Sequence, residues 1–238
     1  GAGPVRRFTA DAAHALAAPL ASIRGHAELA RRVPGPLPPD VAYALGRVEA
    51  ESARLAAAVE DLLLLARLDG GDRGRPGPVD LARLVVEAVG GARAAGPEHR
   101  WVLELPDRPV RVTGDADRLR QVVANLLGNA RTHTPAGSTV TVTLAGAGGP
   151  GDGTVRLTVA DDGPGIPADL LPRVFERFAR GERARSRAPG GTGLGLAIVS
   201  AVVRAHGGTV RADSSPAGTA FRIRLPGTPV PVGVGPEG

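Results

Sequence analysis

The chain has 238 residues, of which 42% are hydrophobic, so it is long enough for one large or two smaller domains with a buried core. Its net charge is +5 and aromatic residues make up only 3%, so it lacks the basic stripe with stacking aromatics that is typical of nucleic-acid binding. It contains no cysteine for disulfides or thiolate metal sites, and no apolar run reaches the roughly 18 residues of a membrane span.

Apolar residues recur at helical spacing along residues 6–32. The proline-rich turn Val33–Pro39 ends this helix, and we expect Asp40 to cap a second helix that runs to about Asp69. Pro19 lies inside the first helix, where a proline costs roughly 3 kcal/mol and bends the chain. Because the apolar period continues upstream of Pro19, we expect a kinked but continuous helix; the alternative is a helix that begins at Pro19.

Residues 1–69 are thus predicted to form a hairpin of two antiparallel helices. A lone hairpin of this size cannot bury both of its apolar faces, whereas two copies in a four-helix bundle can. We therefore expect a homodimer through residues 6–69. The alternative is that the hairpin packs on the rest of its own chain.

The second half of the chain mixes helices and strands after a Gly- and Pro-rich linker at residues 70–79. Helices are expected at 81–94, 115–131 and 195–206, and strands at 101–105, 110–112, 139–144, 155–160, 209–212 and 221–225. Strands in one sheet with helices on one face form an α/β sandwich over residues 80–226, and the tail 227–238 is expected to be disordered. The predicted fold class is α+β.

Three amide side chains, Gln121, Asn125 and Asn129, lie on one face of the predicted helix 115–131, which Asp115 is expected to cap. The oxygen of an Asn side chain can ligate Mg²⁺, a hard cation that prefers oxygen. The amide nitrogen can donate to a phosphate oxygen. The alternative is a polar helix face that simply meets solvent.

Asp161 follows a strand that is expected to be buried, and precedes Gly163 and Gly165. A carboxylate there can accept a hydrogen bond from the exocyclic amine of adenine, whereas guanine presents a carbonyl oxygen at that position. An unsatisfied buried pair costs on the order of 1–3 kcal/mol, enough to favour ATP over GTP. The alternative is an Asp that caps its own turn, which is common in Asp-Asp-Gly.

Three further glycines, Gly191, Gly193 and Gly195, lead into the helix 195–206. Glycines let backbone N–H groups approach phosphates, and the N-terminus of the following helix favours their negative charge. The polar, arginine-rich segment 176–191 before them is expected to act as a mobile lid over the nucleotide.

Two phenylalanines, Phe175 and Phe178, lie at the start of this segment. They are expected to anchor the lid. The alternative is that both are ordinary core residues.

In combination, these motifs resemble the cytoplasmic core of bacterial two-component sensor histidine kinases, in which a dimerisation hairpin precedes a GHKL, or Bergerat-fold, ATP-binding domain. The resemblance covers roughly residues 6–226. Its motifs are an N box, a first glycine box, an F box and a second glycine box, matched by residues 121–129 (QVVANLLGN), 161–165 (DDGPG), 175–178 (FERF) and 191–196 (GTGLGL).

The resemblance implies ATP and Mg²⁺ as cofactors, with Asn125 as the magnesium ligand, Asn129 at the phosphates and Asp161 at adenine. It also implies nucleotide contacts by the glycines of both boxes and by His133, Ile166, Arg177, Phe178, Thr192, Leu194, Leu196 and Thr219. Two positions depart from the family pattern, since His133 stands where many members carry Tyr and Thr132 where many carry Lys.

Gln121 bears on the reaction. ATP-hydrolysing relatives of this fold carry a Glu at the matching position, as the general base for water, and an amide cannot take a proton. We therefore expect the pocket to hold ATP for transfer to another acceptor, with little hydrolysis.

His14 is the candidate acceptor, in a segment similar to the family H box that continues to Pro19. A neutral imidazole is a good nucleophile near neutral pH and would attack the γ-phosphorus in line. A helical His seen alone is usually structural, but the ATP motifs downstream favour a phosphoacceptor. Ala15 replaces the acidic residue that usually orients the imidazole, Ala17 a common Arg, and Ala18 the Thr or Asn thought to position water for dephosphorylation. We expect slow autophosphorylation and little phosphatase activity.

Two functions stay open. In the first, the chain is a protein-histidine kinase core that phosphorylates His14 and passes the phosphoryl group to an aspartate on the receiver domain of a response regulator. In the second, it is a catalytically silent, ATP-binding signalling dimer. A hydrolysing ATPase or an anti-sigma-type serine kinase is disfavoured by Gln121 and by the His-bearing hairpin. The resemblance also implies a cytoplasmic location, as part of an inner-membrane sensor whose membrane segments lie outside this chain.

Overall fold

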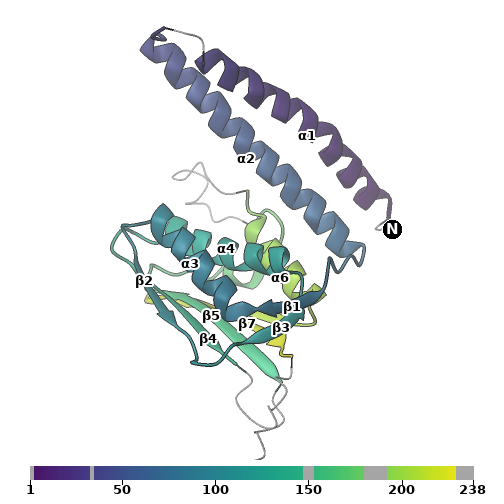
Figure 1. Ribbon diagram of the computed structural model, residues 1–238, viewed down its shortest axis with the longest axis vertical. Coiled ribbons are helices and arrows are strands. Elements are labelled where there is room, and N and C mark those ends of the chain that lie inside the picture. Colours follow the sequence, from purple (N-terminus) through teal and green to yellow (C-terminus); the bar gives the residue numbers. More distant parts are fainter. Residues whose placement is uncertain (1–2, 33–34, 147–152, 180–191, 229–238) are drawn as a thin grey trace, which may run out of the picture.

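The computed structural model describes residues 3–32, 35–146, 153–179 and 192–228, with the backbone alone for residues 3–15 and 17. Two long helices form a hairpin beside a unit of sheet and helices (Figure 1). The fold class is therefore α+β, as the sequence predicts.

The two hairpin helices are α1 (Gly3–Arg31) and α2 (Pro39–Asp69), which run antiparallel to each other (Figure 1). The helix α1 is continuous through Pro19, as expected, and begins three residues before the predicted start at residue 6. Near the turn, Arg31 Nη1 of α1 lies 2.6 Å from Glu49 Oε2 of α2 and ties the helices together.

The expectation that Asp40 caps α2 is wrong. Pro38 occupies the N-cap position, and Pro39 is the first helical residue. A proline fits there because its φ is already set for a helix and the N–H that it lacks would have no partner within the helix. Asp40 lies in the first turn, where a carboxylate interacts favourably with the helix dipole.

Apolar side chains of the hairpin remain largely exposed in the single chain. The exposed ones are Leu16, Ile23, Leu29, Val41, Tyr43, Val48 and Leu55. The C-terminal end of α2 differs, because Leu65 is only 1% exposed and belongs to the core of the α/β unit, with Leu62, Leu64 and Leu68 packed against that core. The hairpin therefore packs on its own chain at the end of α2 and presents apolar side chains to solvent further along.

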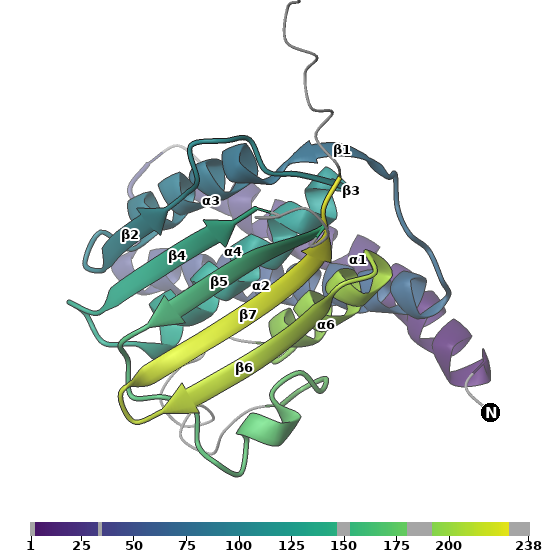
Figure 2. The ribbon, with the colours of Figure 1, turned by 90° about the horizontal axis from the view of Figure 1, so that it is seen from below.

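The α/β unit is built on a mixed five-stranded sheet of order β2-β4-β5-β7-β6, in which β2 and β4 are parallel and the other neighbours antiparallel. Its strands are β2 (Arg100–Glu104), β4 (Thr139–Ala145), β5 (Thr154–Asp161), β6 (Thr209–Ser215) and β7 (Gly218–Pro226). One face is covered by the helices α3 (Leu81–Ala95), α4 (Ala116–His133) and α6 (Gly195–Ala205) (Figure 2). The helices and the strands β2, β4, β5, β6 and β7 all lie close to their predicted positions.

The strands alternate between the two faces of the sheet. Along β4, Val140, Val142 and Leu144 are buried, whereas Thr141 and Thr143 are only partly buried. This period of two places apolar residues under the helices and polar ones on the opposite face. Aliphatic residues dominate the resulting core, with Trp101 and Phe221 as its buried aromatic side chains in the described residues.

One strand was not expected from the sequence. β1 (Gly77–Asp80) pairs antiparallel with β3 (Arg111–Gly114) in a separate two-stranded sheet, although residues 77–79 read as part of a linker. Gly77 and Pro78 are weak strand formers, and the strand is stabilised by its pairing with β3 and by the burial of Val79 against the core. The described residues continue past the predicted end of the domain at residue 226, as far as Thr228.

At that end, the backbone N–H of Gly227 donates to Gly153 O (2.5 Å) and that of Thr228 to Arg111 O (3.0 Å). The rest of the predicted tail, 229–238, lies outside the described residues. None of the helices in the described part of the chain combines the length and apolar character that a membrane span requires.

Candidate nucleotide-binding site

The helix α4 presents the three predicted amides. Asp115 caps it as expected, because its side chain accepts hydrogen bonds from the backbone N–H groups of Asp117 and Arg118. The helix buries its apolar face, which contains Leu119, Val122, Val123, Leu126 and Leu127. On the other side Gln121, Asn125 and Asn129 are all partly buried, so they do not form a freely solvated face.

Asn125 connects α4 to the start of α6. Its Nδ2 donates to the carbonyl oxygen of Gly195 over 3.1 Å, and a Cβ added at Gly195 would lie 3.5 Å from Asn125 Cγ. The bond uses the amide nitrogen and leaves Oδ1 as an acceptor. No group of three or more His, Cys, Asp or Glu that could hold a metal occurs among the described residues. Asn125 Oδ1 is an oxygen ligand of the kind that Mg²⁺ prefers, and this ion usually takes few protein ligands together with substrate phosphates and water, so the residue fits a magnesium ion.

Two predicted site residues are bound to α2. Gln121 Nε2 donates to Asp61 Oδ1 over 3.2 Å, and Arg177 forms an ion pair with Asp69. Burial raises the pKa of Asp61 to about 6, and the negative charge of Glu60 adds to this effect. Neither contact can be predicted from sequence spacing, since the partners lie 60 and 108 residues apart.

Asp161 lies at the end of β5 and is partly buried. Its Oδ1 accepts a hydrogen bond from the backbone N–H of Gly163 over 3.0 Å, so the carboxylate does cap its own turn. Burial raises the pKa of Asp161, although the backbone N–H groups of Gly163 and Thr219 and the charge of His133 act in the opposite direction. A carboxylate has about four acceptor positions, so the hydrogen bonds from the backbone N–H groups of Gly163 and Thr219 leave it able to accept from a further donor.

The first glycine box is held against the β6–β7 turn. Gly165 adopts φ 78°, and a Cβ there would meet Ser215 O at 2.1 Å, so this position requires glycine. Ser214 Oγ accepts from the backbone N–H of Ile166 (2.7 Å) and lies 2.9 Å from the hydroxyl of the buried Thr219. Ser214 thus belongs to the site although no sequence motif marks it.

The second glycine loop is described from Thr192 onward, and the predicted Gly191 lies outside the described residues together with 180–190. Gly193 has φ 72°, and its carbonyl accepts from the backbone N–H of Phe178 over 2.9 Å. Leu194 is fully buried and occupies the N-cap position of α6. Its side chain makes no hydrogen bond to the helix, so no side chain at the N-cap position satisfies the first backbone N–H groups of α6. Leu196 is partly buried against the core.

The two phenylalanines of the F box differ in their surroundings. Phe175 packs on Phe221 edge-to-face, with ring centroids 6.3 Å apart, and therefore anchors the segment in the core. Phe178 is 61% exposed and has φ 61°, an unusual conformation for a side chain of this size. An exposed aromatic ring held by an unfavourable backbone conformation is suited to contact a ligand.

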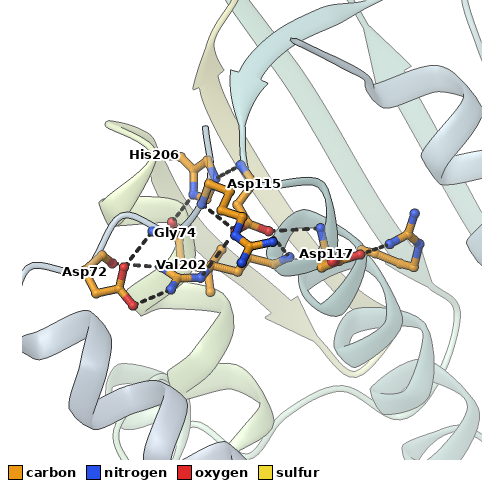
Figure 3. A network of polar contacts seen from close by, with 9 residues as sticks. Asp72, Gly74, Asp115, Asp117, Val202 and His206 are labelled. Atoms are coloured by element: carbon orange, nitrogen blue, oxygen red, sulfur yellow. Dashed lines mark hydrogen bonds and ion pairs between the residues drawn. The ribbon is translucent and has the colours of Figure 1, made fainter. Parts of the chain in front are cut away.

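A polar network ties the segment after α2 to the N-terminus of α4 (Figure 3). The guanidinium of Arg118 donates to the backbone oxygen of Asp72 (2.8 Å) and to its Oδ2 (2.7 Å). The backbone N–H of Asp115 donates to His206 Nε2 (3.0 Å), so His206 donates to Val202 O (2.8 Å) from its protonated Nδ1. The network links the segment after α2, the amide-bearing helix and the end of α6.

The carboxylates of this network are held in the charged form. Hydrogen bonds from the backbone N–H of Gly74 and from Arg118 lower the pKa of Asp72. For Asp115, burial acts to raise the pKa, but the backbone N–H groups of Arg75 and Arg118 and the Arg118 charge outweigh it and lower the pKa. Both aspartates therefore contribute stability at neutral pH that is lost only under acid conditions.

The remaining predicted residues are placed as follows. Asn129 lies one turn beyond Asn125 on α4, and His133 is exposed in the last turn of that helix. His14 lies in α1, where the structure describes the backbone alone.

Comparisons with known proteins identify the family. Residues 114–229 match the family described as "Histidine kinase-, DNA gyrase B-, and HSP90-like ATPase", and residues 5–71 match the "His Kinase A (phospho-acceptor) domain". The chain therefore belongs to the two-component sensor histidine kinases. It contains the hairpin domain of that family and an ATP-binding domain of the GHKL, or Bergerat, fold.

Individual relatives agree with this family. "Probable sensor histidine kinase TcrY" of Mycobacterium tuberculosis is 57% identical over 222 residues, which are 93% of this chain and 46% of that protein. The solved "Mycobacterial sensor histidine kinase MprB" is 38% identical with a TM-score of 0.57, over 65% of this chain and 100% of that chain. Full-length ShkA in complex with AMPPNP is 28% identical with a TM-score of 0.75, over 94% of this chain and 46% of that chain. The chain spans about half the length of the curated relatives it matches.

Proposed function

We propose that this chain is an ATP-dependent protein-histidine kinase core, which phosphorylates its own His14 and passes the phosphoryl group to an aspartate of a response regulator. The observation that supports it best is the hydrogen bond from Asn125 to Gly195, because it brings the amide-bearing helix and the second glycine loop together. Asp161 lies at the other end of the same helix, where Gly163 meets Thr134, the C-cap residue of α4.

Adenine binds at Asp161 in this proposal. Its exocyclic amine donates to an acceptor position of the carboxylate that the backbone N–H groups of Gly163 and Thr219 do not fill. The raised pKa of the partly buried carboxyl reflects how poorly water solvates it before the nucleotide arrives. A guanine carbonyl in the same place would leave two acceptors facing each other. Ile166 and Thr219 contribute to the wall of this part of the site, since both lie beside the glycine turn.

The phosphates bind between Asn125, Asn129 and the loop Thr192–Leu196, where the uncapped N-terminus of α6 favours negative charge. Leu194 is fully buried, so it takes part through its backbone. Bound Mg²⁺, held by Asn125 Oδ1, supplies positive charge that offsets the charge of the triphosphate.

His133, Arg177 and Phe178 complete the contacts to the nucleotide in this proposal. Because Arg177 is paired with Asp69 of α2, its contact with a nucleotide requires that ion pair to open. Phe178 is already exposed.

In the transfer step, a ring nitrogen of neutral His14 attacks the γ-phosphorus. The nitrogen–phosphorus bond forms as the bond to the β–γ bridging oxygen breaks, and ADP leaves with that oxygen. The other ring nitrogen lacks an acidic neighbour at the next position, because Ala15 stands there. A general base contributes roughly 10²–10⁴-fold, so autophosphorylation is slow, and Ala18 likewise leaves little phosphatase activity.

The exposed apolar residues of α1 and α2 support a homodimer through residues 6–69. Side chains such as Leu16, Ile23, Leu29 and Leu55 form the kind of apolar surface that marks an interface. A second hairpin would bury them in a four-helix bundle. We further propose that the full-length protein is a sensor, as its relatives' names say of them, that segments outside this chain hold it in the inner membrane, and that its receiver-domain partner docks near His14.

The second candidate is a silent, ATP-binding signalling dimer, which Ala15 and Ala18 favour. The two candidates are separated by incubating the chain with γ-labelled ATP and Mg²⁺ and testing for a phosphoryl group that is labile in acid and stable in base. His14→Ala should abolish this label. His26→Ala is the matched control, because His26 is an exposed histidine of the same helix.

The kinase proposal expects slow labelling of the unmodified chain and of His26→Ala, and none of His14→Ala. ATP binding without label on any variant would establish the silent dimer. Phosphate release that persists in His14→Ala would show instead that the site hydrolyses ATP despite Gln121.

A further inference from the structure

A buried histidine lies behind the site, at a position that the proposed reaction does not use. His99, the residue before β2, is 7% exposed, and its ring centroid lies 6.0 Å from that of Trp101. Its Nε2 is 3.0 Å from the hydroxyl oxygen of Thr134, the C-cap residue of α4.

The direction of this hydrogen bond follows from counting protons. The Thr134 hydroxyl donates its single proton to Ala130 O over 2.7 Å. It can therefore only accept from the histidine, so His99 Nε2 carries a proton and is the donor. This holds whether the imidazole is neutral or charged.

The other ring nitrogen of His99, Nδ1, is buried in a way that lowers the stability of the fold. His99 Nδ1 is the one buried side-chain nitrogen or oxygen without a hydrogen-bond partner in the described part of the chain. It lies 3.2 Å from Glu98 Oε1, without the geometry of a hydrogen bond. An apolar side chain of similar volume would avoid the cost of this buried polar atom. Such an apolar residue could not make the hydrogen bond that His99 Nε2 donates to Thr134, so this bond is what the histidine contributes.

Thr134 is in direct contact with the turn that carries the purine-binding carboxylate. A Cβ added at Gly163 would lie 2.5 Å from Thr134 Cγ2 and 2.9 Å from Asp161 Oδ1. The methyl group of Thr134 therefore sets how closely Gly163 can approach α4. Gly163 in turn holds the Asp161 carboxylate through its backbone N–H (3.0 Å).

The backbone around His99 is fixed to the same place by further hydrogen bonds. Gly137 N–H donates to Glu98 O (2.8 Å), Arg100 N–H to Ser138 O (2.9 Å), and Thr139 N–H to Asp162 Oδ1 (2.8 Å). Three segments, 98–100, 134–139 and 161–163, are thereby joined behind the site. A side chain in the middle of this junction can move the carboxylate without touching the nucleotide.

We infer that His99 is a positioning residue for purine recognition: its Nε2–H fixes Thr134, and Thr134 fixes Gly163 and the carboxylate of Asp161. The inference rests on the proposed role of Asp161 as the acceptor for the exocyclic amine of adenine. It predicts that His99 affects discrimination at that amine more than it affects binding of the ribose and phosphates.

The test compares two ligands on each protein: ATP, and purine riboside triphosphate, which lacks the exocyclic amine. The preference is the ratio of the two dissociation constants, and a ratio does not depend on the fraction of protein that is folded. We expect the unmodified chain to prefer ATP about tenfold, and His99→Phe and Thr134→Val to reduce the preference to about threefold or less, because one fixed hydrogen bond is lost in each. Affinity for purine riboside triphosphate should change less than twofold.

Two further variants separate positioning from general stability. His99→Gln places an amide N–H donor near the position of Nε2 and should restore most of the preference. Thr143→Val removes a threonine hydroxyl that bonds to Glu104 on the sheet, and should leave the preference unchanged.

The inference would be overturned if both His99→Phe and Thr134→Val kept the full preference for ATP. It would also be overturned if His99→Gln lost as much of the ATP preference as His99→Phe. If the unmodified chain itself shows no preference for ATP, the proposed role of Asp161 fails, and the inference fails with it for that separate and recognisable reason.

Discussion

Replacement of Asp61 by asparagine should make the stability of the protein respond differently to pH. Asp61 on α2 accepts a hydrogen bond from Gln121 on α4, and burial raises its pKa to about 6 from 3.8. An asparagine keeps an acceptor for Gln121 and removes the charge. The variant therefore isolates the cost of holding a carboxylate at this contact between hairpin and ATP-binding domain.

The sign follows from the protons bound in each state. Below pH 3.8 the carboxyl is protonated in both the folded and the unfolded chain, so there is no cost. Between pH 3.8 and about 6 the folded protein binds the proton more tightly, so its stability falls as the pH rises, and the cost is complete above about 6. The full difference corresponds to about 3 kcal/mol, and solvent screening of this partly buried group reduces it to about 1–2 kcal/mol.

Thermal melts followed by circular dichroism between pH 4 and 7.5 measure this difference. Asp61→Asn should melt with the unmodified chain near pH 4 and about 2–8 °C above it at pH 7, since 1 kcal/mol moves the Tm of a chain this size by about 2–4 °C. Asp107→Asn, at an exposed loop aspartate, is the matched control and should show no such divergence. The proposed cost of the Asp61 carboxylate would be refuted if the difference in Tm between Asp61→Asn and the unmodified chain did not change with pH. It would also be refuted if Asp61→Asn were less stable than the unmodified chain at pH 7.

Three other substitutions test separate parts of the structure. Gly165→Ala forces a Cβ to within 2.1 Å of Ser215 O at φ 78°, so calorimetry should find ATP affinity reduced at least about tenfold; unchanged affinity would contradict the close approach of the glycine turn to β6. Leu65→Ala removes a fully buried side chain between α2 and the ATP-binding domain and should cost about 2–5 kcal/mol in urea unfolding, whereas a loss under 1 kcal/mol would mean that this contact is not packed. Asp115→Ala removes the cap of α4 and should lower unfolding stability by about 0.5–2 kcal/mol, and no loss would show that the helix end is satisfied in another way.

The sequence predicts those parts of the site that depend on local periodicity. The spacing of Gln121, Asn125 and Asn129 puts them on one side of α4, opposite the buried leucines and valines, and the structure places them there. Asp115 was expected as a cap because an aspartate before an apolar helical period satisfies free backbone N–H groups. Both features are set by residues within a few turns of each other.

Features that depend on distant partners could not be predicted in this way. Nothing near Asp61 indicates that Gln121 will face it, because the contact depends on how α2 packs on the ATP-binding domain. The sequence does not indicate β1, because Gly77 and Pro78 are typical of a linker and the strand depends on its pairing with the distant β3. Residue type does not distinguish Phe178 from Phe175, yet in the structure Phe178 is exposed and Phe175 packs on Phe221.

Isothermal titration calorimetry measures whether the face of α4 and the two glycine turns bind a magnesium–adenine nucleotide. We expect saturable heat with Mg–ATP at one site per chain, at least about tenfold weaker binding of Mg–GTP, and loss of the ATP preference in Asp161→Asn. No heat with Mg–ATP on folded protein, or equal affinity for ATP and GTP, would show that the nucleotide does not bind there as proposed.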